Sequence, residues 1–396
     1  MALLPVADAL ARILAGARVT TAEDVPLAQA MGRVLAAPLK ARRDQPPFDA
    51  SAMDGYAVIA GDGPGLKVIG TSAAGHRFTG TVKKGQAVRI FTGAPMPKGA
   101  NAVIIQENVE AQDGAITCGE PVRAGQNVRP AGLDFRKGEM LIGAGTALNA
   151  RDLGLAAAMN CATIRVRRKP HVVVFATGDE LVEPGGRPNA DQIISSNSTA
   201  LAALCEHFGA RVTNLGIVRD DLKATIRTVK KAAQADILLT TGGASVGDHD
   251  YVQDALKASG VSVDFWKIAM RPGKPFMYGR KGHQHVMGLP GNPVSAQVCA
   301  RLFVLPLLKA MAGLDPHEPE SLAALGAAMK ANDGRQDYVR ATLVVAPDGM
   351  RVATPFTRQD SSMQRTFREA QCLIIRPPQA PETPAGTPVP VLLLDF

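Results

Sequence analysis

Three glycine-rich stretches constrain the fold of this chain more than any other feature of its sequence. They cover residues 177–180, 240–247 and 289–295, and each follows a short apolar run with the composition of a buried strand. A strand that ends in glycines and leads into a helix leaves free backbone N–H groups, which attract phosphate or another oxyanion. Because acidic residues accompany the glycines, a magnesium ion could bridge them to that phosphate. Together the three junctions predict a nucleotide-type pocket along one edge of a sheet.

The size and composition of the chain indicate a globular protein of several domains. A length of 396 residues exceeds one ordinary hydrophobic core, so we expect about two to four domains. The shares of 46% hydrophobic and 20% charged residues are typical of soluble proteins. The net charge of +8 is spread along the chain without an arginine-rich or aromatic-rich stripe, which disfavours nucleic acid as a partner.

Cysteine usage and the N-terminus bear on the compartment. The five cysteines are odd in number and lack metal-ligand spacing, so we expect reduced and mostly buried thiols. Asp8 and Arg12 interrupt the apolar stretch of the first 17 residues, which favours an amphipathic helix over a signal peptide. We find no apolar run of membrane-spanning length. These observations predict a cytoplasmic protein without a membrane partner.

The first half of the chain divides into a helical zone and a β-rich zone. Residues 1–45 are expected to be helical, with Thr20 or Thr21 capping a second short helix. Residues 46–143 combine frequent Gly and Pro with short β-type runs, which predicts an inserted β domain. A helix near 150–159 and a strand near 163–166 then return the chain to the first helices. We therefore expect an elongated, discontinuous N-terminal domain made of residues 1–45 and 144–168.

The second half predicts two further domains. Strands alternate with helices over residues 169–316, which indicates a doubly wound α/β domain with a mostly parallel sheet. Its longest helix covers residues 293–311, with Asn292 placed to cap it and Pro293 at its first position. Residues 317–396 form strands again, over 338–345, 351–355 and 372–376, and predict a small β-barrel. The expected fold class is therefore multidomain α/β plus β.

Six motifs resemble, in the same order, those of one known family. They are PPFDASAMDGYAV (46–58), FTGAPMP (91–97), TGDEL (177–181), GGASVG (242–247), RPGKP (271–275) and LPGNPVS (289–295). The set is similar to the molybdopterin molybdenumtransferases, the bacterial enzymes that complete molybdenum cofactor synthesis and are related to the E domain of gephyrin. The resemblance covers nearly the whole chain. One such motif would be weak evidence, whereas six in register are strong.

The resemblance implies a reaction and an assembly. Adenylylated molybdopterin and molybdate would give molybdenum cofactor and AMP, with Mg²⁺ as the metal. The family forms an elongated homodimer, in which the α/β domain of one subunit would meet Asp54 of the partner subunit. A molybdopterin adenylyltransferase is a further partner to expect. Such a reaction asks the protein mainly to position substrates and neutralise charge.

Motif matching also carries the family's substrate and metal contacts onto this sequence. The catalytic and magnesium-binding roles fall on three acids, which have the hard oxygen atoms that magnesium prefers: Asp54, Glu180 and Asp250. Contacts with adenylylated molybdopterin fall on Thr92, Arg129, Asp134, Asp220, Gly242, Gly243, Ser245, Pro290, Gly291, Asn292 and Pro293.

Each of these acids also has a structural interpretation that the sequence leaves open. Asp54 precedes a glycine in a turn where Asp is common, and Glu180 could cap a helix. Asp220 and the neighbouring Asp221 could form an ordinary helix start, because acids favour the first turn. Likewise, Ser245 and Ser295 are as typical of helix caps as of ligand contacts.

Molybdate is an oxyanion, so cations and hydroxyl groups are its expected contacts. By resemblance these are Lys267, Arg271, Lys274, Ser295, Arg340 and Ser361. The first three lie on or just after a predicted strand, and a solvated basic loop is the alternative. Arg271 stands where many relatives have lysine. This replaces the compact ammonium group of lysine with the planar guanidinium of arginine, whose N–H groups form a fork. Around Ser361 the glycines of relatives are missing, so the conformation of this loop stays open.

Two other function classes compete with this interpretation. An adenylyltransferase or another enzyme could share the α/β domain, but the roughly 170 residues before that domain argue against it. A non-catalytic scaffold is the other class, since the same fold anchors receptors in animals. Retention of the acids and the basic trio favours chemistry. His283 and His285 are more typical of a hairpin turn than of a metal site. Trp266 is more typical of core packing than of stacking on a base.

Overall fold

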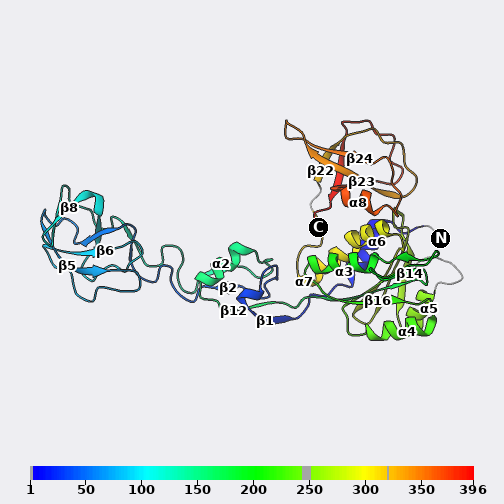
Figure 1. Cartoon of the computed structure of the whole chain (residues 1–396), viewed down its shortest axis with the longest axis horizontal. Coiled ribbons are helices and arrows are strands. Elements are labelled where there is room, and N and C mark those ends of the chain that lie inside the picture. Colours follow the sequence, from blue (N-terminus) through cyan, green and yellow to red (C-terminus); the bar gives the residue numbers. More distant parts are fainter. Residues whose placement is uncertain (1–2, 243–250, 319–320) are drawn as a thin grey trace. The chain divides into compact units, whose positions relative to one another are not determined.

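The computed structural model describes residues 3–242, 251–318 and 321–396. These residues form two compact units, each with its own hydrophobic cores (Figure 1). The large unit comprises Met1–Glu23 and Arg167–Phe396, and the small unit comprises Asp24–Val166. The chain therefore begins in the large unit, builds the small unit and then returns.

A twisted sheet forms the centre of the α/β domain in the large unit. Among the described residues it has six strands, in the order β16-β13-β17-β21-β20-β18. Strands β16, β13, β17 and β21 run parallel, and β20 and β18 extend the sheet antiparallel. Their bounds are β13 His171–Thr177, β16 Arg211–Val218, β17 Ile237–Thr241, β18 Ser262–Lys267, β20 Pro275–Lys281 and β21 Gln284–Leu289. The predicted doubly wound fold is confirmed.

Helices cover both faces of this sheet (Figure 1). Val172 and Val174 lie in the core on the α3 side, and Val173 and Phe175 lie in the core on the α4 side. Because alternate side chains of a strand point to opposite faces, this double burial explains the continuous apolar run of β13. The helices are α1 (Val6–Ala15), α3 (Asn197–His207), α4 (Leu222–Lys231), α5 (Tyr251–Ala258), α6 (Pro293–Cys299) and α7 (Leu305–Ala312).

The N-terminal segment corrects two predictions. Helix α1 buries Val6, Ala9 and Ile13 in the core of the α/β domain, so residues 1–23 do not join the discontinuous N-terminal domain. The second short helix is wrong as well, because strand β1 (Ala22–Pro26) takes its place. The Thr20 hydroxyl donates to the carbonyl of Arg168 at 2.7 Å instead of capping a helix.

The predicted long helix is continuous over Pro293–Ala312, with a π-helical turn, η3 (Ala300–Val304), between α6 and α7. By length and composition it could cross a membrane, which corrects the statement that no apolar run has that length. However, 78% of its 18-residue window is buried inside the fold, as in the core helices of globular proteins. The apolar character of this helix is therefore accounted for by the packing of the α/β domain.

The C-terminal residues form the predicted β-barrel. In the part of the chain that is described, the sheet order is β19-β23-β24-β22-β26-β25, and pairing of β23 with β25 closes it. The strands are β19 (Met270–Arg271), β22 (Ser321–Leu325), β23 (Gln336–Val345), β24 (Arg351–Pro355), β25 (Cys372–Arg376) and β26 (Pro388–Leu393), with helix α8 (Gln364–Glu369). Strand β19 comes from the α/β domain and runs parallel to β23.

The barrel and the α/β domain share one core. Tyr338, Phe367 and Leu373 of the C-terminal region lie in the same apolar cluster as Met270 and Val298. Burial of this shared cluster stabilises the two domains as one body within the large unit.

The small unit contains the predicted β-rich insertion, residues 46–143, together with the segments on either side of it. Within the described residues its main sheet has the order β7-β4-β6-β5-β9-β8. A capping box starts helix α2 (Ala150–Ala158), in which Asn149 and Asp152 each bond the other's backbone N–H. The other elements are η1 Leu27–Gln29, β2 Leu39–Lys40, β3 Ala50–Ser51, β4 Gly55–Val58, β5 Leu66–Ser72, β6 Gln86–Ile90, β7 Ala102–Ile105, η2 Gln106–Asn108, β8 Val109–Gln112, β9 Ala115–Cys118, β10 Val128–Arg129, β11 Met140–Ile142 and β12 Thr163–Arg167.

Smaller predictions are also confirmed. All five cysteines are free and buried. His283 lies in the turn between β20 and β21, and His285 is buried beside the Tyr278 hydroxyl at 3.0 Å. Burial lowers the pKa of His285 to about 4, so this ring is neutral at physiological pH. Trp266 packs against the core on the α4 side.

Candidate functional site in the large unit

A cavity of about 920 Å³ opens where the parallel strands β13, β17 and β21 end. The α/β domain supplies Thr177, Thr241 and Pro290 at these strand ends, and the barrel supplies a loop around Ser361. This is the edge of a parallel sheet at which ligands of α/β proteins bind. Its location agrees with the pocket predicted from the three glycine-rich junctions.

Ten of the predicted site residues line this cavity together. They are Glu180, Gly242, Arg271, Lys274, Pro290, Gly291, Asn292, Pro293, Ser295 and Ser361. Gly243, Ser245 and Asp250 lie outside the described residues. Among those that are described, Asp220, Lys267 and Arg340 do not line the cavity.

The glycine-rich junctions pack directly against one another. Gly242 has a φ of 86°, and a Cβ atom there would lie 2.3 Å from the carbonyl oxygen of Thr177. Gly291 approaches from the third junction, with its Cβ position 3.8 Å from the Cα of Gly242. Glycine is therefore required at Gly242 by both conformation and space, and the sequence prediction that these loops meet is confirmed.

Asn197 links two of the junctions, and sequence reasoning missed this role. Its side-chain amide donates to the hydroxyl of Thr241 at 2.9 Å and to the carbonyl of Gly291 at 2.6 Å. The amide oxygen of Asn197 and the hydroxyl of Thr177 are buried and have no hydrogen-bond partner among the described residues. Such unmet groups cost about 1–3 kcal/mol each, so they indicate a place where a ligand supplies partners. A polar run directly before the helix at residue 197 was the available signal.

The barrel loop is fastened to the start of helix α6. Asn292 occupies the N-cap position, but its side chain donates to the Ser361 hydroxyl at 2.7 Å instead of capping the helix. The backbone N–H of Val294 donates to the carbonyl of Ser361 at 3.0 Å. Gln364 adds a bond to the Ser196 hydroxyl at 2.6 Å. The prediction of a side-chain cap by Asn292 is therefore wrong, and Ser361 keeps only its own O–H for a ligand.

The basic residues have very different surroundings. Lys274 is exposed on the cavity wall, and no described residue pairs with its ammonium group. In contrast, the Arg271 guanidinium forms a two-pronged ion pair with Asp337, at 2.9 and 2.6 Å. These hydrogen bonds raise the pKa of Arg271. Lys274 is thus the free cation of this cavity within the described part of the chain.

Arg340 and Lys267, two of the predicted molybdate contacts, do not line the cavity. Arg340 is only 1% exposed, and its Nε and backbone N–H both donate to the side-chain oxygen of Gln359, at 3.2 and 3.0 Å. Burial lowers the pKa of Arg340. Lys267 ends the edge strand β18 and pairs with Pro275 of the cavity lining, but Lys267 does not itself line the cavity. Gln359, a lining residue 19 positions away, thus holds Arg340 behind the cavity wall, and local sequence does not encode this contact.

The acids at the sheet edge divide into two kinds. Glu180 lines the cavity, and no described residue donates a hydrogen bond to its carboxylate. Asp221 instead caps helix α4 by accepting from the backbone N–H of Ala224 at 2.6 Å, which confirms the structural interpretation for this acid. Asp220 lies beside it, with its N–H 3.3 Å from the Asp179 carboxylate. No group of three or more His, Cys, Asp or Glu residues forms a metal cluster among the described residues.

The small unit holds the remaining predicted residues. Asp54 Oδ1 accepts from both the backbone N–H and the hydroxyl of Thr92, each at 2.7 Å. These bonds, with a smaller effect of Arg89, lower the pKa of Asp54, while Oδ2 accepts no bond from a described residue. The next residue, Gly55, has no room for a side chain, because its Cβ would lie 1.9 Å from the Ile104 carbonyl oxygen. The turn therefore holds an ionised carboxylate with one free oxygen.

Arg129 and Asp134 lie near this turn in the same unit. Strand β10 pairs Arg129 with Ala50, three residues before Met53, and Gly93 donates to the Ser51 carbonyl at 2.8 Å. Asp54, Thr92 and Arg129 are thus grouped around strand β3. Asp134 is exposed farther along, where its N–H donates to the Gln45 carbonyl at 2.9 Å.

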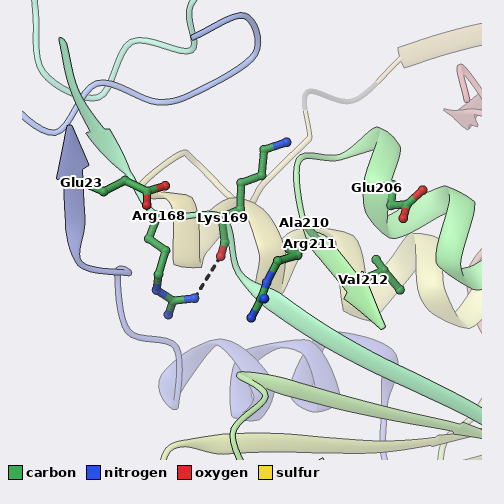
Figure 2. A pocket seen from close by; sticks show the side chains of 7 residues that line it. All are labelled: Glu23, Arg168, Lys169, Glu206, Ala210, Arg211 and Val212. Atoms are coloured by element: carbon green, nitrogen blue, oxygen red, sulfur yellow. Dashed lines mark hydrogen bonds between the residues drawn. The ribbon is translucent and has the colours of Figure 1, made fainter. Parts of the chain in front are cut away.

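A second cavity of about 630 Å³ lies in the large unit where strands β13 and β16 begin (Figure 2). Figure 2 shows Arg168 donating to the carbonyl of Lys169, a bond of 3.0 Å. The Arg168 guanidinium is also held by Asp236 at 2.8 and 2.9 Å. Because this hollow lies at the amino ends of the strands and Arg168 is already paired, the cavity at the carboxyl ends is the better candidate site.

Comparisons with known proteins cover the same regions. Three family profiles match: the MoeA N-terminal region (domain I and II) at residues 4–160, a probable molybdopterin binding domain at 173–310, and the MoeA C-terminal region (domain IV) at 323–394. A molybdopterin molybdenumtransferase of Haemophilus influenzae is 35% identical over 379 residues, which cover 94% of each chain. Another, from Nostoc sp., is 38% identical over 304 residues, covering 74% of this chain and 70% of the relative.

Solved structures agree with these matches. Two structures of the molybdopterin biosynthesis MoeA protein from Pyrococcus horikoshii have TM-scores of 0.86 and 0.81, at 29% and 30% identity, and this chain covers both completely. The chain is therefore a transferase with a role in molybdenum cofactor biosynthesis. It belongs to the molybdopterin molybdenumtransferase family. Matches outside the α/β domain disfavour the adenylyltransferase alternative, and the enzymatic relatives disfavour a scaffold.

Proposed function

We propose that this protein inserts molybdenum into adenylylated molybdopterin, using molybdate and releasing AMP. The observation that carries the proposal is the cavity in which Glu180, Lys274 and the glycine-rich junctions converge at the carboxyl edge of the parallel sheet. Free backbone groups at such an edge suit a pyrophosphate, and an unpaired lysine suits a tetrahedral dianion. The names of the relatives, which are molybdopterin molybdenumtransferases, support the transfer of molybdenum to a molybdopterin.

The residues of the cavity suit a division of labour between binding and charge. Asn197 and Thr177 offer unmet hydrogen-bonding atoms for a polar ring or linker of the substrate. Lys274 and the hydroxyl of Ser295 face the cavity where an oxyanion needs donors. The protein thereby lowers the barrier mainly by holding two anions close together and neutralising their repulsion.

Magnesium fits the donor set of these residues. Glu180 presents a carboxylate without a described hydrogen-bond donor, and Asp54 presents a free Oδ2 in the small unit. One or two carboxylates together with substrate phosphate and water are the usual magnesium ligands. When bound, the ion would neutralise charge on the phosphoanhydride that is cleaved. Asp250, the third predicted ligand, lies outside the described residues.

A homodimer in the cytoplasm is part of the same proposal. The family resemblance implies that Asp54 of the partner subunit completes the site. The five unpaired cysteines suit a reducing compartment. Mixing Asp54→Ala with Glu180→Ala, which removes the carboxylate from the cavity of the large unit, tests the shared site, because only a mixed dimer can then combine both intact residues. Failure of the mixture to regain activity, with subunit exchange verified by mass, would refute the shared site.

The reaction itself is tested with purified protein, adenylylated molybdopterin and magnesium, with and without molybdate or tungstate. We expect AMP release that depends on the oxyanion and matches the cofactor formed mole for mole. Omission of magnesium in the presence of a chelator should stop both products. AMP release without cofactor formation, or no dependence on either oxyanion, would contradict the proposed function.

A further inference from the structure

The pair formed by Arg271 and Asp337 joins the cavity wall to the barrel. Asp337 is nearly buried, with a side chain 8% exposed, whereas the Arg271 side chain is 48% exposed. The guanidinium meets both carboxylate oxygens, Nε to Oδ1 at 2.9 Å and Nη2 to Oδ2 at 2.6 Å. A fork of this kind fixes orientation as well as distance, which a lysine in the same place could not do.

The backbone reinforces this connection. Arg271 in β19 is the direct partner of Asp337 in the parallel strand β23. The N–H of Gln336 donates to the carbonyl of Ala269 at 2.9 Å. Strand β19, at the start of the turn that carries Arg271 and Lys274, is therefore an added strand of the barrel sheet. Its pairing with β23 fixes where this turn begins.

The remainder of the turn leaves little freedom to Lys274. Its carbonyl accepts from the N–H groups of Ile268 and Phe276, both at 3.1 Å. Gly273, one residue earlier, is packed so tightly that a Cβ atom would lie 2.6 Å from the Cys299 sulfur. The backbone of Lys274 is thus fixed from both sides, while its ammonium group is exposed toward the cavity.

The charges around Arg271 cancel. Asp333 lies 3.7 Å from Arg271 Nη1 and forms a second fork with Arg335, at 3.2 and 2.7 Å. Hydrogen bonds from Arg335 lower the pKa of Asp333 to about 2, so this carboxylate is ionised. Two arginines and two aspartates therefore form a network without net charge. An oxyanion that drew Arg271 away would leave the nearly buried Asp337 unpaired, which is costly.

We infer that Asp337 is a positioning residue, which holds Arg271 as a strut between the barrel and the basic turn and leaves Lys274 to meet the oxyanion. The inference rests on the proposed function, since molybdate is the oxyanion concerned. It assigns to Arg271 in this chain a role different from that of a direct oxyanion ligand.

A double-mutant cycle separates the two roles of Arg271. The proteins are the wild type, Arg271→Gln, Asp337→Asn and the double variant, and the readout is the molybdate concentration for half-maximal AMP release. A strut predicts that each single variant raises this concentration by about tenfold and that the double variant is no worse than either. The KM for adenylylated molybdopterin should change less than the molybdate value does.

Two further variants complete the test. Arg271→Lys keeps the charge but loses the fork, so it should behave like Asp337→Asn. Asp348→Asn, an exposed acid in the turn between β23 and β24, is the matched control and should leave molybdate use near the wild-type level. Melting temperatures verify that each variant is folded.

Several outcomes would overturn the inference. If Asp337→Asn left the molybdate concentration for half-maximal AMP release unchanged or lowered it, Arg271 would be a direct ligand. Additive losses in the double variant would lead to the same conclusion. Near wild-type behaviour of Arg271→Lys would do the same. Calorimetric binding of molybdate to the same proteins without nucleotide gives a second readout. If the wild type bound molybdate without turnover, the proposed function would fail while the strut remained testable.

Discussion

Asp54 in the small unit and Arg271 in the large unit show two opposite uses of a charged residue beside a glycine turn. Both residues belong to motifs that predict chemistry. Thr92 binds one oxygen of Asp54 and leaves the other free, whereas Asp337 occupies the fork of Arg271. The comparison teaches that a motif fixes the place of a charge but not its availability, which depends on partners elsewhere in the chain.

The difference between Asp54 and Arg271 also has a physical cause in how many binding atoms each group has and which of them are occupied. A carboxylate has two equivalent oxygens, so a hydroxyl and an N–H can hold one of them while the other binds a cation. A guanidinium paired side-on to a nearly buried carboxylate keeps spare N–H groups, but the carboxylate offsets its positive charge. Asp54 is therefore expected to matter directly, and Arg271 through what it holds.

The largest effect should come from Asp54→Ala. We expect AMP release and cofactor formation to fall by about a hundredfold or more, because the free carboxylate oxygen is lost. The melting temperature should change little, since the side chain is partly exposed. Glu110→Ala, an exposed acid of strand β8 in the same unit, is the control and should stay near wild-type activity. Equal losses in both variants would remove the distinction drawn for Asp54.

Lys274→Ala should have an intermediate effect that sharpens the contrast with Arg271. Removal of the free cation should raise the molybdate requirement by about tenfold, with a smaller change in the KM for adenylylated molybdopterin. Lys281→Ala, an exposed lysine at the end of β20, is the control. Titrations of both substrates check this, and a larger loss for the nucleotide than for molybdate would contradict the assignment.

Thr92→Val should give the smallest effect, visible in pH dependence. The variant loses the hydroxyl bond and keeps the backbone N–H bond, so the lowered pKa of Asp54 should rise toward its ordinary value. The acid limb of kcat/KM should then move to higher pH by less than about one unit, with little change at neutral pH. Stabilisation by these bonds is present when Asp54 is ionised and is lost as pH falls through its folded-state pKa.

Thr92→Ser is the companion measurement for this pH shift. It keeps the hydroxyl and should retain the wild-type profile. A shift as large as that of valine would mean that the methyl group, and not the hydroxyl bond, controls the titration of Asp54.

Local signals made much of the fold predictable. The β13 run Val172–Ala176 was recognisable because both faces of the strand are buried. The grouping of Gly242 with Gly291 followed from the rule that parallel strands end at one edge. Cys372–Arg376 and Arg351–Pro355 were predicted with the observed bounds, because apolar alternation and turn residues delimit them.

The rest required contacts between residues far apart in sequence. Asn292 has the pattern of a helix cap, yet Ser361, 69 positions away, takes its side chain. Arg340 has the family position of an oxyanion ligand, yet Gln359 binds it within the wall. Thr20 looked like a helix start because its partner, the carbonyl of Arg168, is 148 residues distant. No local pattern encodes such partners.

The short strand β19 has a consequence for how members of this family can be recombined. An exchange of C-terminal barrels between two relatives would separate Asp337 from its own arginine and Ser361 from its own asparagine. A transplanted barrel would thus need matching residues at 271 and 292 in the recipient, so these four positions form an inherited set that has to travel together.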